Sequence, residues 1–166
     1  MCLPLKIIGC LFLTAASFGA GCLLSARLFR RRAFLRRLLS FVSLLSTELR
    51  YRGGDIFDLV SDCAGRSQLP ALCVGKPESC FEDAWNAAIN ALPGTFSLTG
   101  EDISLLREIG SQLGKTDLEG QLKHLSLLEI RVRAHLRDAE ECMAQKSRIY
   151  KTMGFFVGAS AAIVLM

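Results

Sequence analysis

The sequence lacks the short motifs that mark the common enzyme classes. It has no glycine-rich phosphate-binding loop, no Gly-x-Ser-x-Gly nucleophile turn, no His-Glu-x-x-His zinc motif and no Glu-x-x-His pair. Its two histidines, His124 and His135, are eleven residues apart, which is about 16 Å along a helix and too far to share a metal ion. The adjacent pair Glu101-Asp102 would point about 100° apart on a helix and cannot act as a facing acid-base couple. We therefore expect no catalytic residues, no metal ion and no cofactor.

Closely spaced cysteine pairs are also missing. The chain has seven cysteines but no Cys-x-x-Cys, and an odd number leaves one thiol unpaired in any disulfide scheme. We interpret them as reduced, small hydrophobic side chains on the cytosolic side or in lipid. Zinc held by Cys63, Cys73, Cys80 and a histidine is an alternative, but these cysteines lack the short spacings that structural zinc sites favour. A membrane-bound thiol or metal-dependent enzyme that uses them or Cys142 also stays open.

Charge is absent from two long stretches of the chain. Residues 7–26 contain none, and none follows Lys151. The first stretch would span about 30 Å as a helix, which matches a hydrocarbon core, and the last fourteen residues about 21 Å. The hydrophobic content of 51% and the mean hydropathy of +0.33 exceed those of an ordinary soluble domain. We expect an N-terminal transmembrane segment (1–26), a cytosolic helical domain (27–150) and a short C-terminal transmembrane segment (151–166).

Basic charge is concentrated directly after the first apolar stretch. Residues 27–52 contain eight arginines against a single acidic residue, Glu48. Six of these arginines lie closest to the expected membrane: Arg27, Arg30, Arg31, Arg32, Arg36 and Arg37. Such a cluster holds its side in the cytoplasm, which puts both termini outside, and attracts lipid head groups at about 1 kcal/mol per residue. Nucleic acid is not an expected partner, because no aromatic residues interleave the cluster on a polar face.

A signal peptide is the alternative for the first apolar stretch. Gly19-Ala20-Gly21-Cys22 faintly resembles a lipoprotein cleavage box, and Lys6 precedes the run. Apolar sequence continues past Cys22, however, and the arginine cluster follows immediately. Both features favour a membrane span.

The rest of the chain has apolar residues at helical spacing and no strand-length alternation. The first helix should continue to about Arg50, where Gly53-Gly54 breaks it. Later helix starts are indicated by four capping patterns: Asp55, Ser79-x-x-Glu82, Thr99-x-x-Asp102 and Thr116-x-x-Glu119. Gly114 should supply the left-handed residue between the last two helices. We predict an all-α fold, a cytosolic antiparallel helical bundle flanked by an N-terminal and a C-terminal transmembrane helix.

The last predicted helix has the clearest pattern and should continue unbroken into the C-terminal segment. Its expected core positions are Leu118, Leu122, Leu125, Leu128, Val132, Leu136, Ala139 and Met143. We interpret its other face, which includes Lys123, Glu129 and Arg137, as solvated. Small residues four apart in the membrane segments predict close helix packing in lipid: Gly19, Gly154, Gly158 and Ala162. The alternative is that glycine and alanine are simply common in membrane spans.

Two sets of residues carry a resemblance to a known family. Ile109-Gly110-x-x-Leu113-Gly114-x-x-Asp117-x-x-x-Gln121 and Tyr150-Lys151-x-x-Gly154-Phe155-x-x-Gly158 resemble the stage III sporulation protein AB family, and the likeness covers nearly the whole chain. Members are similar to the cytosolic helical domain of type II secretion platform proteins. The resemblance implies a non-enzymatic platform in the mother-cell membrane facing the forespore, within a secretion-like channel complex of endospore formation. The implied partners are a secretion-type ATPase on the cytosolic side and other membrane proteins of the channel.

The matched residues Gly110, Leu113, Gly114, Asp117 and Gln121 would then mark a helix-turn-helix corner. Gly114 suits the turn, and the charge of Asp117 suits a helix N-terminus. These residues either only build the corner or also contact the ATPase, and caps and turn glycines explain most of the choices. A membrane-anchored helical adaptor of another envelope complex is the alternative function. Residues 63–80 do not match the family pattern.

Overall fold

The computed structural model describes the backbone of residues 3–52, 54–74 and 80–165, and the side chains of residues 26–52, 54–74, 80–94 and 96–145. Within these ranges the regular secondary structure is entirely helical and contains no strand, so the all-α prediction is confirmed. The helices are α1 (Leu3–Tyr51), α2 (Ile56–Arg66), α3 (Phe81–Asn90), α4 (Gly100–Gln112) and α5 (Leu118–Leu165). Two short 3-10 turns, η1 (Pro70–Leu72) and η2 (Gly94–Phe96), lie on either side of α3.

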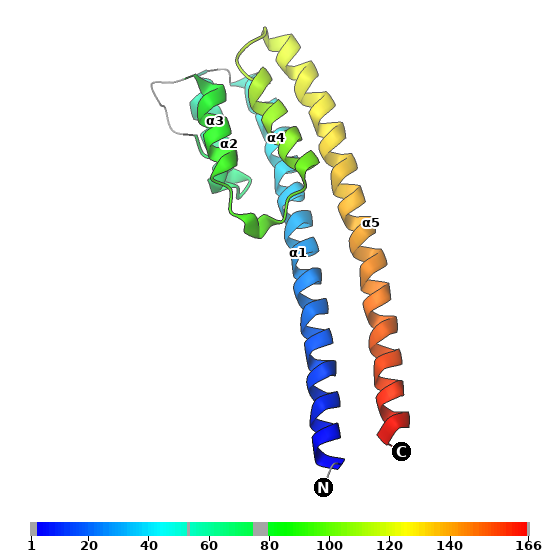
Figure 1. The fold of residues 1–166 in the computed structure, drawn as a ribbon. Helices are drawn as coiled ribbons and strands as arrows, with labels where there is room; N and C mark the ends of the chain where they lie inside the picture. The colour runs from blue at the N-terminus through cyan, green and yellow to red at the C-terminus, as the bar shows by residue number, and fades with distance from the viewer. Residues whose placement is uncertain (1–2, 53, 75–79, 166) are drawn as a thin grey trace.

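The two long helices form the frame of the molecule. α1 has 49 residues and α5 has 48, so each is about 70 Å long. They run side by side in opposite directions, which brings the two termini to the same end (Figure 1). The three short helices gather at the other end, where α2 packs on α1 and α4 lies between α3 and α5. The molecule is therefore a helical body with a two-helix extension.

The core of the body forms where one face of α1 meets one face of α5 and the short helices cover the rest. From α1 it takes Phe34, Leu35, Leu38, Phe41, Val42, Leu45 and Leu49, and from α5 Leu125, Leu128, Val132, Leu136 and Ala139. Trp85 of α3 is fully buried, and its ring lies 5.9 Å from the rings of both Phe41 and Phe81. Its Nε1 donates a 2.8 Å hydrogen bond to the carbonyl oxygen of Leu106. This bond satisfies the one polar atom of a large buried side chain.

Local signals predicted most helix boundaries correctly. The Asp55 side chain accepts a hydrogen bond from the backbone N–H of Phe57 at the start of α2. Thr99 and Asp102 form the predicted capping box of α4. Gly114 has φ +80°, which L residues rarely adopt. The prediction of one helix from the first apolar stretch to about Arg50 is confirmed by α1, and that of an unbroken last helix by α5.

Three local predictions were wrong. α5 begins at Leu118, so its N-cap position is Asp117, one residue later than the Thr116 capping pattern requires. The N-cap of α3 is Cys80, one residue later than the Ser79 capping pattern requires. Leu118, expected in the core, is 49% exposed. It lies in the first turn of α5, and the fully buried residues of that helix begin only at Leu125.

Among the residues whose side chains the structure describes, no helix is both long and apolar enough to cross a membrane. The predicted membrane spans lie almost entirely outside these residues. Residues 1–25 and 146–166 lie outside the described side chains. The same holds for the predicted packing residues Gly19, Gly154, Gly158 and Ala162.

Candidate functional site

A buried carboxylate joins three helices at the start of α4. Asp102 is 1% exposed and accepts hydrogen bonds on both side-chain oxygens. From α1, Arg31 donates through Nε to Oδ2 at 2.7 Å and through Nη2 to Oδ1 at 3.1 Å. From α5, Nδ1 of His135 lies 2.9 Å from Oδ1, and the backbone N–H of Thr99 completes the set at 2.9 Å from Oδ2. This junction of Arg31, Asp102 and His135 links α1, α4 and α5 at one point.

The electrostatics of the junction favour the ionised carboxylate. Burial by itself would raise the pKa of Asp102, because desolvation disfavours a charge. Hydrogen bonds from Arg31, His135 and Thr99 act against burial and hold this pKa well below its usual range. Each oxygen of Asp102 already has two partners, so the group offers no open acceptor to a substrate. The arrangement is suited to holding α1, α4 and α5 together.

The six arginines of the basic cluster divide into two groups. Arg31 is committed to Asp102, while Nε of Arg32 and Nη2 of Arg36 donate to Oε1 of Glu140 on α5 at 2.9 and 3.0 Å. Arg27, Arg30 and Arg37 form no ion pair within the described side chains. The predicted contact of all six with lipid head groups remains a prediction. Arg31 pairs with α4, and Arg32 and Arg36 pair with α5, so these three arginines also hold the helical body together.

The predicted corner residues come together at the end of the molecule opposite the termini (Figure 1). An ideal Cβ on Gly110 would lie only 2.1 Å from Cδ1 of Trp85, so the tryptophan ring packs directly on the glycine. Leu113 is buried, and Gly114 makes the left-handed turn. Packing and backbone conformation thus explain these three residues. Asp117 and Gln121 remain accessible, and Nε2 of Gln121 donates to the Thr116 carbonyl oxygen at 2.6 Å.

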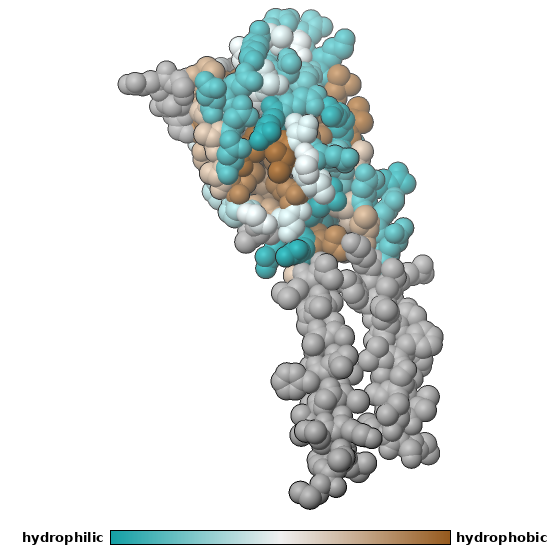
Figure 2. Space-filling view, viewed as in Figure 1, coloured by the Kyte–Doolittle hydropathy of each residue, from teal (hydrophilic) through white to brown (hydrophobic). Residues whose placement is uncertain are grey.

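An exposed apolar face of α5 was missed by the sequence interpretation. Leu127 is 54% exposed and Ile130 is 63% exposed, although both belong to the face predicted to be solvated. Figure 2 shows hydrophobic surface along the outer edge of α5. The signal was present, since positions 127, 130 and 134 recur at three-four spacing opposite the core leucines. It was overlooked because the core leucines of the same segment form a denser pattern.

The cysteines do not assemble into a site within the described residues. No group of three or more metal-ligating side chains occurs there. Cys63 is buried, and desolvation raises the pKa of its thiol to about 11, which opposes a thiolate nucleophile. Cys73, Cys80 and Cys142 are exposed, free thiols.

Thiol labelling should separate these cysteines. At neutral pH a maleimide should modify Cys73, Cys80 and Cys142 of the full chain and leave Cys63 unmodified, because only the accessible thiolate reacts. Mass spectrometry of the labelled peptides, before and after addition of denaturant, measures the difference. Labelling of Cys63 in the folded protein at the rate of the other three would contradict its burial.

Comparison with known proteins identifies the family of this chain. The model of stage III sporulation protein AB matches residues 6–166. Stage III sporulation protein AB of Bacillus subtilis (strain 168) is 24% identical over 170 residues, an alignment that covers 98% of this chain and 99% of the relative. No solved structure matches the chain. Because the family match spans nearly the whole sequence, this chain belongs to the stage III sporulation protein AB family.

Proposed function

We propose that this protein is a non-enzymatic membrane platform of a secretion-like channel complex in endospore formation, and that it docks a cytosolic secretion-type ATPase. Family membership supports a role in sporulation. In this proposal the apolar ends of α1 and α5 cross the mother-cell membrane facing the forespore. The helical body then lies in the cytosol, and both termini lie outside it.

The arrangement of α1 and α5 is the observation that carries this proposal. The two helices are antiparallel neighbours, so the apolar residues 7–26 and 152–165 lie at one end and the helical body at the other (Figure 1). Such an arrangement suits a two-span anchor that presents a body on one side of a membrane. Ion pairs from Arg31, Arg32 and Arg36 connect the base of the body, which would let it act as a rigid support.

The exposed face of α5 is the surface we propose for the ATPase. Isolated exposed apolar residues are ordinary, but Leu127 and Ile130 lie one turn apart on the same face of a long helix. Nearby ion pairs, Glu129 with Arg133 and Glu108 with Arg131, surround them with polar groups. An apolar centre with a polar rim is typical of a protein–protein interface. The corner residues Asp117 and Gln121 are the competing surface.

A substitution at the centre of this face should weaken docking. Ile130→Asp in the full chain should reduce affinity for the ATPase at least about tenfold, because it buries an unpaired charge in the interface. Folding should be little affected, since surface changes usually alter stability by about 0.5 kcal/mol or less. Affinity can be measured by pull-down and by titration of the detergent-solubilised proteins.

Ser104→Asp is the matched control, because it adds the same charge at an exposed position of α4. It should leave docking unchanged. If Asp117→Ala abolished docking and Ile130→Asp did not, the corner would be the contact surface. If the wild-type chain bound no such ATPase and deletion of its gene left spore formation intact, the platform proposal would fail.

A further inference from the structure

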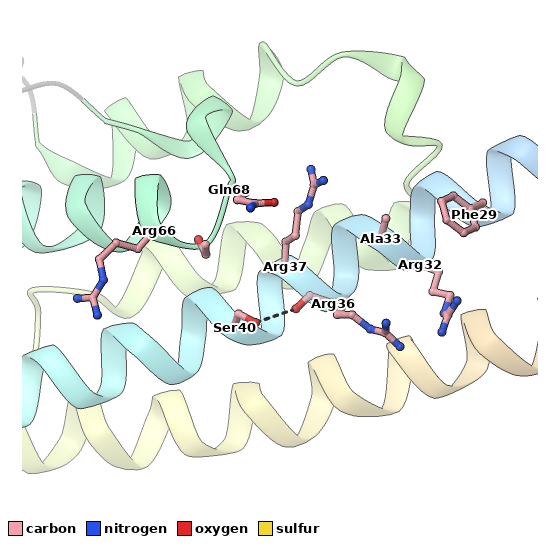
Figure 3. Close-up of a pocket in the computed structure, with 9 residues that line it drawn as sticks. Phe29, Arg32, Ala33, Arg36, Arg37, Ser40, Arg66 and Gln68 are labelled. Atoms are coloured by element: carbon pink, nitrogen blue, oxygen red, sulfur yellow. Dashed lines mark hydrogen bonds between the residues drawn. The ribbon is translucent and has the colours of Figure 1, made fainter.

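A basic pocket lies between α1 and the turn that follows α2. Its volume is about 400 Å³. Its lining includes four arginines, Arg32, Arg36, Arg37 and Arg66, together with hydroxyl and amide groups and no carboxylate. Phe29 closes one end and is itself largely exposed (Figure 3). A pocket with this lining favours an anion.

The arginines of the pocket carry more positive charge than the neighbouring carboxylates neutralise. Arg32 and Arg36 share a single carboxylate, that of Glu140. Arg66 is paired with Glu48 through a 2.5 Å contact. Arg37 forms no ion pair or hydrogen bond within the described side chains. Arg32, Arg36 and Arg37 together with Glu140 therefore leave an excess of two positive charges beside the pocket.

Gln68 supplies a second available donor opposite Arg37. The amide of Gln68 and the guanidinium of Arg37 lie opposite each other with the amide oxygen nearer to Arg37, whereas Arg66 points away (Figure 3). A 180° rotation of the amide brings its N–H₂ group to the same place. Gln68 has φ +59°, a left-handed conformation in which glycine or asparagine is the usual residue. The turn holds it there, because the backbone N–H of Gln68 donates to the Gly65 carbonyl and that of Leu69 to the Ala64 carbonyl. These bonds fix the backbone of Gln68 at the end of α2, and its side chain extends from there beside the pocket.

We propose that this pocket binds a phosphate-class anion through Arg37 and Gln68. A guanidinium can donate two parallel hydrogen bonds to a phosphate, and the amide N–H₂ can donate a third. Arg32 and Arg36 add positive electrostatic potential to the pocket while they keep their ion pairs with Glu140. A divalent phosphate matches the excess charge of two.

The anion could come from a soluble phosphorylated molecule or from a lipid head group, and distance favours the soluble source. Arg37 lies eleven residues after Ala26, where the first apolar stretch ends, which is about 16 Å along α1. The head-group region of a bilayer is only about 5–8 Å thick on each side. If the apolar stretch spans the membrane as proposed above, Arg37 lies beyond the depth of ordinary head groups, which revises the expected head-group contact for this arginine of the cluster.

Phosphate titration of the full chain tests the site. The protein is reconstituted in phosphatidylcholine nanodiscs and titrated with inorganic phosphate at constant ionic strength, with binding followed by calorimetry. Wild type should bind in a saturable manner, and Arg37→Gln should weaken binding about tenfold or more, because a charge-assisted donor pair is lost. Arg50→Gln is the matched control, since Arg50 is an exposed arginine of the same helix about 20 Å away. It should bind as wild type does.

A second variant keeps the result interpretable if Arg37→Gln fails to fold. Gln68→Gly removes the amide and relieves the left-handed backbone, so it should retain the fold and still weaken phosphate binding several-fold. Repeating the titration in nanodiscs that contain phosphatidylglycerol distinguishes the sources. Unchanged phosphate binding indicates a soluble ligand, and competition by the anionic lipid indicates a head group. Absence of saturable phosphate binding by wild type, or equal binding by the Arg37→Gln, Gln68→Gly and Arg50→Gln variants, would overturn the proposal.

Discussion

Gly110→Ala should lower the free energy of unfolding by about 1–3 kcal/mol, which is the usual effect of overpacking a core. A Cβ at this position would meet Cδ1 of Trp85 at 2.1 Å and Cγ at 2.6 Å. The ring cannot easily move away, because its Nε1 is hydrogen bonded to Leu106 and its faces pack on Phe41 and Phe81. The new methyl group must therefore displace helix α3 or α4.

Gly65→Ala is the matched control for this substitution. Gly65 also lies in a helix, α2, but nothing lies within 4 Å of its ideal Cβ. Alanine should be neutral there or stabilise by up to about 1 kcal/mol through helix propensity. Denaturant titration of both variants can be followed by circular dichroism and by the fluorescence of Trp85, which is the single tryptophan. Equal stability of the two variants would contradict the close packing of Trp85 on Gly110.

Asp102→Ala should cost about 3–5 kcal/mol of folding free energy, because it removes one partner of a buried ion pair and leaves the other without compensation. The Arg31 side chain is 14% exposed and would lose both of its carboxylate hydrogen bonds. His135 would lose its contact as well, and the Thr99 backbone N–H would lose its cap. Glu101→Ala is the control, since Glu101 is an exposed carboxylate one residue earlier in the same helix. Its effect should stay within about 0.5 kcal/mol.

The same junction should make stability depend on acid pH. The pKa of Asp102 is lowered in the folded state, whereas an unfolded aspartate titrates near about 3.9. The unfolded chain therefore binds the proton first, and the stabilisation is complete above about pH 4 and is lost as the pH falls toward the folded pKa. Unfolding measured from pH 7 downward should show this loss in wild type. Asp102→Asn, which cannot ionise, should have a flatter profile, and identical slopes would refute this role of Asp102.

Interactions between residues close in sequence could be predicted from the sequence alone. The Asp55 and Thr99 caps, the turn glycine Gly114 and the unbroken length of α1 all depend on contacts within about four residues, so the chain itself specifies them. The boundary of α3 was misjudged by one residue because Ser79 and Cys80 can each precede a helix. The family resemblance was likewise carried by sequence motifs, and the match over residues 6–166 confirms it.

Features that depend on which helix faces which could not be read in this way. In the sequence Asp102 was identified only as part of a capping box, but its carboxylate also binds an arginine 71 residues earlier and a histidine 33 residues later. In the sequence Gly110 was identified only as part of a family motif. The structure shows that glycine is required there because the ring of Trp85, on another helix, packs directly against it.

By itself, the sequence determined that this protein is all-α, approximately where its helices begin and end, and that both apolar stretches belong to its two longest helices. Hydrophobic periodicity and helix capping depend on residues close in the sequence, so they can be recognised from the sequence alone. Only the tertiary structure decided that Leu118 is left exposed at the start of α5, and which arginines of the cluster are paired with carboxylates. The physical reason is that burial and ion pairing depend on the partner helix, whose position is set by packing across the whole chain.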